Sequence, residues 1–466
     1  MPVKQNNHSI IRIAYLGLLF SLLGLNSCIF KPKKSMFIKE KQITFDDKGH
    51  LLNHTQIFSA DGKWVVYDTR NDDSKIGSTP SIEMVNLETG EMKELYRTQN
   101  QTEYGPGVGA ATFSPVESKV IFIQGVRNAN KEKPYGFTRR TGVAIDINNP
   151  GNPIYMDARD VVPPFTAGAL RGGTHAHSWS GDGEMIVFTY NDYVIEQLSK
   201  NNSAIQDLRT VGVMFPGKVS VRQDSDLENN NGEMFSVIIS AVKENPTPET
   251  DEIDKAFDEC WIGKEGYINS QGKRVKKAVA FQGNVRDAKG NSKTEIFIVD
   301  LPEDLTRAGE NPLQGTEETR PGIPVGVKQR RLTNLMNGVQ GPRHWLRSTP
   351  DGSSLIFLSK DKKGFINAYA VSVNGGPESQ ITNNEFDIQS GVNISPDGKY
   401  LAYVAKNAIF ITHIETAETR QLTQSVADAT KPASAVMWSP DGKKLVYNRY
   451  TENSKGNFLQ IFSLDL

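Results

Sequence analysis

Short apolar runs alternate with tight-turn sequences along most of the chain, and this pattern predicts β-hairpins. In the last copy, Ser-Pro-Asp-Gly at 439–442 precedes Leu-Val-Tyr at 445–447. Pro suits the first central position of a type I turn, Asp bonds to nearby backbone, and Gly accepts a left-handed conformation. The residues that follow are β-branched and aromatic, which favours a strand. Each copy therefore predicts one antiparallel hairpin.

The turn recurs at a regular spacing. Thr349 and Ser395 are 46 residues apart, and Ser395 and Ser439 are 44 apart. A period of about 40–45 residues made of short strands is typical of a β-propeller. We therefore predict an all-β, seven-bladed β-propeller, with eight blades as the alternative. Further copies of the turn, some of them degenerate, lie at 59–62, 114–115 and 180–183.

The two ends of the folded region are predicted to meet in one blade. Residues 39–44 resemble the segments that close later repeats, such as 330–333 and 420–423. The chain ends in the apolar run 458–464, which resembles a third strand with nothing after it. We expect residues 38–44 to supply the outer strand of the last blade, because ring closure removes an exposed sheet edge.

Blade four lacks the turn sequence, so its strands are predicted from apolar runs alone. We expect its inner strand at 235–242, its second at 278–282 and its third at 295–300. An insertion at about 244–276 separates the first two. Its acidic residues suit the first turn of a helix, which we predict over 251–260.

The N-terminal segment has the features of a targeting sequence. A positive start precedes the apolar run 13–25, which is short for a membrane span, and Leu-Asn-Ser-Cys follows. This resembles a bacterial lipobox, so we predict a lipoprotein signal peptide over 1–27, lipidation of Cys28, and a tether over 28–37. An ordinary signal peptide or an uncleaved anchor is the alternative. The propeller would then occupy 38–466, in the cell envelope and facing the periplasm.

Composition excludes several classes of function. The net charge is −1 and the sequence pI about 6.7, without a basic run in the folded region, which argues against nucleic acid as a partner. Two cysteines cannot make a disulfide framework. The sequence has no Gly-x-Ser-x-Gly elbow and no nucleotide-binding fingerprint. Contact with a membrane is expected only through the lipid anchor, and the oligomeric state stays open.

Counting back five positions from each turn aligns three histidines near the start of the inner strands. These are His54, His175 and His344, and His177 follows His175 at i+2. Alternate residues of a strand face the same side, so this pair could share a divalent metal, Zn²⁺ or Mn²⁺, with His54 or His344 completing the set. The alternative is that these polar residues bond to neighbouring blades and to channel water.

Other polar residues lie near the same mouth by the same alignment. We predict ligand-binding roles for Arg171, Arg343, Asp387 and Gln389. Arg343 can bind a carboxylate or phosphate with two parallel hydrogen bonds. Cys260 is expected to be a small core residue rather than a nucleophile.

The repeats resemble those of TolB-like and WD40-like propellers of bacterial envelopes, of the PD40 type. The segments 171–177, 188–192, 342–345 and 387–390 resemble the YidR-like family more closely, and the similarity runs over about residues 40–466. That family has no established biochemical activity. The resemblance therefore implies the fold and leaves the function open.

Oligogalacturonate lyase is a more distant relative in architecture, with metal-binding histidines at its channel mouth. Gly172 stands three residues before the first histidine of the pair, where that family has a glutamine ligand. Two functions follow as hypotheses. The first is an envelope-anchored binding or scaffolding protein for a protein, peptide or glycan. The alternative is a metal-dependent lyase or hydrolase that acts on an anionic saccharide.

Overall fold

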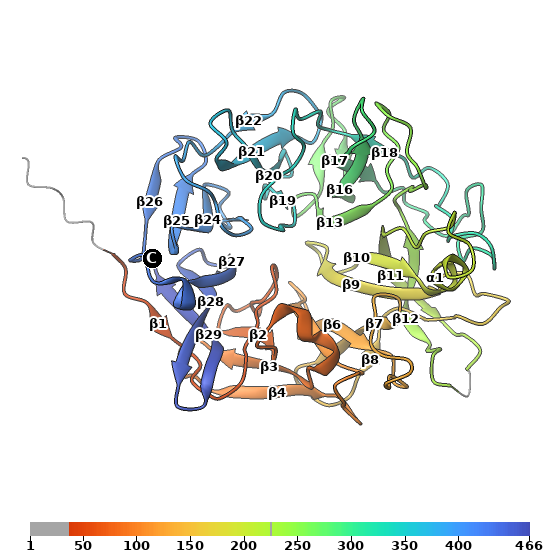
Figure 1. The fold of residues 1–466 in the computed structure, drawn as a ribbon, viewed down its shortest axis with the longest axis horizontal. Coiled ribbons are helices and arrows are strands. Elements are labelled where there is room, and N and C mark those ends of the chain that lie inside the picture. The colour runs from red at the N-terminus through yellow and green to blue at the C-terminus, as the bar shows by residue number, and fades with distance from the viewer. Residues whose placement is uncertain (1–36, 224–225) are drawn as a thin grey trace, which may run out of the picture. The chain divides into compact units, whose positions relative to one another are not determined.

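The computed structural model of the protein describes residues 37–223 and 226–466. Within these residues, seven antiparallel sheets are arranged around a central axis, with strands such as β9 (Gly172–Trp179) and β27 (Pro432–Trp438) nearest to it (Figure 1). The predicted all-β, seven-bladed propeller is therefore confirmed, and the eight-bladed alternative is not needed.

Blades one to three are formed by consecutive strands, counted outward from the axis. Blade one has three regular strands, and its inner segment pairs with β2 through isolated bridges at Leu51 and Phe58. The strands are β2 (Trp64–Asp68), β3 (Ser81–Asn86) and β4 (Met92–Arg97); β5 (Val108–Phe113), β6 (Lys119–Gly125), β7 (Arg140–Asp146) and β8 (Ile154–Tyr155); and β9, β10 (Ile186–Asp192), β11 (Thr210–Val219) and β12 (Gly232–Ile238).

Blades four to six follow the same order, and blade four also carries a two-stranded hairpin, β14 (Tyr267–Ile268) with β15 (Arg274–Val275). Their strands are β13 (Ala256–Trp261), β16 (Ala278–Arg286), β17 (Ser292–Asp300) and β18 (Gln329–Arg331); β19 (Arg347–Ser348), β20 (Ser354–Lys360), β21 (Ile366–Ser372) and β22 (Ser379–Gln380); and β23 (Asn393–Ile394), β24 (Tyr400–Ala405), β25 (Ala408–His413) and β26 (Thr419–Gln421).

Blade seven joins the two ends of the described chain, as predicted. It contains β27, β28 (Lys444–Asn453), β29 (Gly456–Asp465) and, at its outer edge, β1 (Lys41–Gln42). Lys41 pairs with Ser463, and Gln42 with Phe462. This pairing covers the backbone groups that β29 would otherwise expose.

The repeated turn has the hydrogen bonds that its sequence predicts. Ser439 Oγ donates to Asp441 Oδ1 at 2.6 Å and accepts from the Lys444 amide at 2.9 Å. Asp441 also accepts from the Lys443 amide at 3.1 Å, and Gly442 has φ 71°. The hydroxyl–carboxylate bond recurs in the turns that begin at Ser59, Ser180, Thr349 and Ser395.

Blade four differs from the prediction in two respects. The segment predicted as its inner strand, 235–242, contributes instead to β12, the outermost strand of blade three, where Phe235 pairs with Phe215. The predicted helix over 251–260 is also wrong, because β13 occupies the second half of that range and is the inner strand of blade four. The predicted insertion at 244–276 therefore contains a core strand and the β14–β15 hairpin.

The inner strands of several blades carry a β-bulge at a residue with positive φ. The residues are Ala110 (φ 56°), Ala176 (58°), Asp258 (51°) and Ser434 (63°), and the pairing register of each strand shifts there. A bulge adds one residue to a strand, so it changes which side chains share a face.

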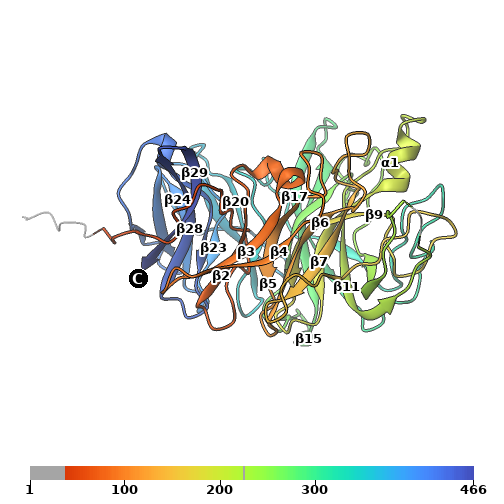
Figure 2. The same ribbon diagram turned by 90° about the horizontal axis from the view of Figure 1, so that it is seen from below.

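The two faces of the ring carry different elements (Figure 2). Helix α1 (Tyr193–Ser199) lies on one face and the β14–β15 hairpin on the opposite one. Asp192 caps α1 by accepting from the Ile195 amide at 3.0 Å. We call these the α1 face and the turn face, since the inner strands begin near α1 and end at the repeated turns. Two 3-10 helices, η1 (Asp73–Ser78) and η2 (Asp428–Thr430), complete the elements of the described residues.

Candidate functional site

A cavity of about 280 Å³ lies where the inner strands begin, on the α1 face. Its walls come from six of the seven blades, and blade four is the exception. Blade one contributes His54, blade two Ala110, blade three His175, blade five Trp345 and blade six Gln389. The cavity is therefore the mouth of the central channel.

Arg347 and His54 close the inner end of this mouth. Arg347 Nη2 reaches from blade five to blade one, where it donates to the His54 carbonyl at 2.7 Å and lies 3.3 Å from His54 Nδ1. The His54 ring stacks on Trp345, with ring centroids 3.7 Å apart. Burial, with Arg347 and Arg343, holds the pKa of His54 well below its usual range, so the imidazole is neutral.

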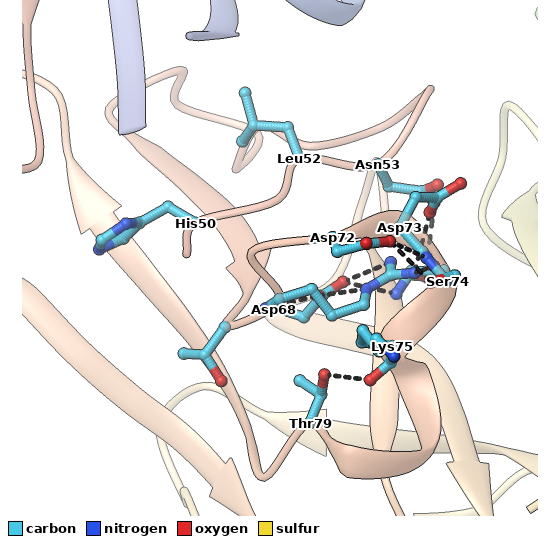
Figure 3. A network of polar contacts seen from close by, with 12 residues as sticks. His50, Leu52, Asn53, Asp68, Asp72, Asp73, Ser74, Lys75 and Thr79 are labelled. Carbon is cyan, nitrogen blue, oxygen red and sulfur yellow. Dashed lines mark hydrogen bonds and ion pairs between the residues drawn. The ribbon is translucent and has the colours of Figure 1, made fainter. Parts of the chain in front are cut away.

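In the wall from blade one, the carboxylates of Asp68 and Asp73 bind a single cation, Arg70 (Figure 3). Arg70 donates from Nε and Nη2 to the two carboxylate oxygens of Asp68, at 2.6 and 2.8 Å. Its Nη1 bonds Asp73 in η1 at 2.9 Å. Asp72 caps η1 by accepting from the Ser74 amide at 2.8 Å. The Arg70 guanidinium is therefore already bound by carboxylates of the protein.

His175 and His177 do not share a face, although they are two residues apart. The bulge at Ala176 lies between them and turns their side chains in different directions. His175 lines the mouth, whereas His177 is fully buried and its Nε2 lies 3.0 Å from Thr174 Oγ1. Burial, with the charge of Arg140, lowers the pKa of His177 to about 3.

Both ring nitrogens of His344 are used within the fold. Nδ1 donates to the Pro342 carbonyl at 2.9 Å, and Nε2 accepts from the Leu358 amide at 3.1 Å. Among the described residues, no group of three or more His, Cys, Asp or Glu side chains is placed to hold a metal ion. The predicted site formed by His54, His175, His177 and His344 is therefore not assembled.

Four cations, one from each of blades two to five, lie near one another beside this cavity: Arg140, Arg209, Lys255 and Arg343. We call them the mouth cations. Of the four, Arg343 lines the cavity itself. The Phe137 ring lies between two of them, with its centroid 5.1 Å from Arg140 Cζ and 5.4 Å from Arg209 Cζ. A backbone hydrogen bond of 2.9 Å links Ala256, next to Lys255, to the Arg209 carbonyl. Their proximity lowers the pKa of His175, for which burial is the larger cause, followed by the three arginines.

The mouth cations carry more positive charge than the surrounding protein neutralises. Within the described ranges, only Arg343 among them forms an ion pair, with Asp258 at 3.0 Å. Burial, with Arg140 and Arg343, lowers the pKa of Arg209, and burial, with Arg209, lowers that of Lys255. Burial is the larger cause of both shifts and the neighbouring arginines add to it, so the charged form of each group is less favoured there than in water.

Two of the predicted ligand-binding residues line the mouth and two do not. Arg343 and Gln389 do. Arg171 is fully buried, pairs with Asp192 at 2.8 Å and donates to the carbonyls of Thr316 and Thr319, so it anchors the long 301–328 segment. Asp387 accepts from the Ile366 amide at 2.8 Å.

Sequence reasoning missed three of the mouth cations. Arg140 opens β7 and Arg209 directly precedes β11. Both strands are the third of their blade, whereas the alignment on the repeated turn locates only the inner strands. Lys255 precedes β13, a strand that the predicted helix concealed. The sequence did contain one signal for this site, the pair Arg139-Arg140 at the start of a strand. A charged residue at the start of a buried strand is costly unless a partner of opposite charge binds it.

The leader falls outside the described residues. The predictions for 1–27, for Cys28 and for most of the tether at 28–37 therefore concern a part of the chain that the structure does not describe. In the part that it does describe, no helix is long and apolar enough to cross a membrane.

A family model described as "Protein of unknown function (DUF3748)" matches residues 107–229. The "Uncharacterized protein YidR" of Escherichia coli (strain K12) is 38% identical over 416 residues, which cover 87% of this chain and 94% of that protein. Among solved structures, "Oligogalacturonate lyase in complex with manganese" has a TM-score of 0.50 at 11% identity, covering 92% of this chain and 93% of that chain. A TolB from Acinetobacter baumannii has a TM-score of 0.35 at 15% identity, covering 87% and 80%.

The likeness to the lyase shows the propeller fold alone, because so low an identity does not carry function with it. The relative in Escherichia coli is different, since its sequence aligns over nearly the whole of both chains. The chain belongs to the YidR family of β-propeller proteins.

Proposed function

We propose that this protein is a binding protein of the bacterial cell envelope, anchored through Cys28 and facing the periplasm, whose channel mouth binds an acidic ligand. The ligand is a carboxylate-bearing segment of a protein, peptide or glycan. The observation that supports this most is the group of mouth cations, for which the described residues supply one ion-paired carboxylate, Asp258.

An excess of positive charge in a concave, partly buried site costs stability unless an anion enters. Arg343 is well placed for such contact, because its side chain is 53% exposed and its guanidinium lies 4.4 Å from the Trp345 ring centroid. The exposed Phe137 ring lies against two other mouth cations, Arg140 and Arg209. A ligand with carboxylates on an apolar or sugar framework would satisfy both the cations and the rings.

The alternative, a metal-dependent lyase or hydrolase on an anionic saccharide, has less support from the geometry. It requires converging ligands, and His344 and His177 are engaged elsewhere. Binding does not require converging metal ligands, and Arg343 and Trp345 already line the mouth.

Calorimetric titration with acidic and neutral probes of matched shape tests the proposal. We expect trigalacturonate or triglutamate to bind, and the galacturonate methyl ester or triglutamine to bind at least tenfold more weakly, since each charged hydrogen bond contributes about 1.5–3 kcal/mol. The affinity should fall with added salt, because charge attraction is screened. The two acidic probes distinguish a glycan from a peptide ligand.

Variants locate the binding. Arg209→Gln with Arg343→Gln should abolish most of the difference between acidic and neutral probes. Lys218→Gln is the matched control, because Lys218 is an exposed cation on β11 that pairs with Glu233 at 3.0 Å, away from the mouth. Equal binding of acidic and neutral probes, or full binding by the double variant, would contradict the proposal.

A further inference from the structure

Arg140 is a buried arginine in which the two nitrogens that carry three of the five N–H donors have no hydrogen-bond partner among the described residues. Its side chain is 2% exposed, and its Nη1 bonds the Tyr135 hydroxyl at 3.1 Å. Neither Nε nor Nη2 has a hydrogen-bond partner among the described residues. A buried charged donor without a partner is costly, so it points to a group that completes the site.

The unused atoms form one particular edge of the guanidinium. In three other arginines of the described chain, the Nε–Nη2 edge binds an aspartate. Arg70 binds Asp68 at 2.6 and 2.8 Å, and Arg171 binds Asp192 at 3.2 and 2.8 Å. Arg343 contacts Asp258 through the same two atoms, at 3.3 and 3.0 Å.

Arg140 presents this edge without an aspartate. Among the buried polar atoms of the described residues, it is the arginine for which both Nε and Nη2 are without a partner. Two parallel N–H groups match the two oxygens of a planar carboxylate. The missing partner therefore has the chemistry of a carboxylate.

Phe137 covers this guanidinium. The ring centroid lies 5.1 Å from Arg140 Cζ, and the side chain is 62% exposed. A largely exposed phenylalanine leaves apolar surface in water, so it is held weakly and can move. A Cβ placed on the preceding Gly136 would meet no atom within 4 Å, so the backbone there also has space.

We propose that the Nε–Nη2 edge of Arg140 is a carboxylate-binding subsite of the channel mouth, and that Phe137 is a cap that moves aside when the ligand enters. This rests on the proposed function and deepens it, because it names the group of the ligand that is recognised and the residue that recognises it. The other mouth cations attract the ligand, and Arg140 fixes the orientation of one carboxylate.

The test is the binding of trigalacturonate and triglutamate to two variants, measured at equilibrium and by surface plasmon resonance. Arg140→Lys keeps the positive charge but removes the paired Nε and Nη2 donors. We therefore expect at least a tenfold loss of affinity for the acidic probe that binds the wild type. Phe137→Ala removes the cap, so we expect faster association. Arg97→Lys is the matched control, since Arg97 is an exposed arginine of β4 paired with Glu94.

The outcomes separate the inference from the proposed function. If neither acidic probe binds the wild type, the proposed function and the Arg140 subsite are both contradicted. If the wild type binds and a folded Arg140→Lys variant, checked by circular dichroism, binds within twofold of it, only the subsite is overturned. Unchanged association by Phe137→Ala would overturn the cap. Competition by inorganic phosphate as strong as that by acetate would overturn the assignment to a carboxylate.

Discussion

Glu259, on β13, is a buried acid whose protonation is coupled to folding. Its side chain is 1% exposed, one carboxyl oxygen accepts from Thr189 Oγ1 at 2.7 Å, and the other has no partner in the described chain. Burial, with a smaller contribution from Asp258, raises the pKa of Glu259 to about 7 in spite of the opposing effects of Thr189 and Arg343. The protonated form therefore suits the folded protein better than the charged form.

This predicts a loss of stability as the pH rises. In the unfolded chain Glu259 has a pKa near 4.5, below that of the folded state. The stabilisation is therefore complete below pH 4.5 and is lost as the pH rises through 7. A shift of this size corresponds to roughly 3 kcal/mol. The melting temperature of Glu259→Gln should fall less than that of the wild type between pH 5 and pH 8, and identical pH profiles would contradict this assignment.

At the scale of single residues, the sequence predicted which histidines lie near the channel but not their directions. His54, His175 and His344 do line the mouth. The rule that residues i and i+2 share a face failed at His177, because the bulged Ala176 adds a residue between them. Alanine is unusual at positive φ, so no local signal announced the bulge.

At the scale of elements, ring closure by β1 was predicted from the sequence because its segment resembles other outer strands. The structure adds two contacts that reinforce the pairing. Glu40 accepts hydrogen bonds from the Tyr447 hydroxyl and from Arg449 Nη1, the latter at 2.7 Å. The short strand is therefore fixed to blade seven by side chains as well as backbone.

Removing this strand should expose β29 as an edge. We compare a chain that begins at residue 37 with one that begins at residue 45. The shorter chain should melt at a lower temperature and self-associate, since an open edge pairs with other chains. Calorimetry and light scattering after gel filtration measure the two effects. Equal melting temperatures and equal masses would show that β1 does not hold the ring closed.

Blade four could not be assigned from the sequence, because it lacks the turn that marks the others. In its place, β13 leads through Gly263 into the β14–β15 hairpin before β16 begins. The acids near 251–254 suggested the start of a helix, yet Glu252 instead caps a turn by accepting from the Thr247 amide at 2.8 Å. Acidic residues satisfy turns and helix ends alike, so composition alone did not decide between them.

At the scale of the whole molecule, the mouth cations assemble from four blades. Arg140 and Lys255 are 115 positions apart in the chain; Arg140 opens the third strand of its blade, whereas Lys255 precedes the inner strand of its own. A one-dimensional alignment on the repeated turn found the inner strands, so it identified Arg343 and missed the others. Only the closed ring brings them together.

The proposed anchor is tested on the complete protein. Cys28→Ser should move the protein from the membrane fraction to the soluble fraction of the bacterial envelope, because the cysteine thiol carries the lipid in this scheme. Mass spectrometry of the wild-type N-terminal peptide should find a diacylglyceryl-modified Cys28. An unmodified N-terminus, or unchanged fractionation of the variant, would contradict the lipoprotein assignment.

The most direct measurement of the central claim is a crystal structure of the protein with a bound acidic probe, trigalacturonate or triglutamate. The account predicts a probe carboxylate within hydrogen-bonding distance of a guanidinium of the mouth cations, above the floor that Arg347 and His54 form. A probe seated instead in the cavity of about 720 Å³ that is lined by Leu208 and Ile323, or on the turn face, would contradict it.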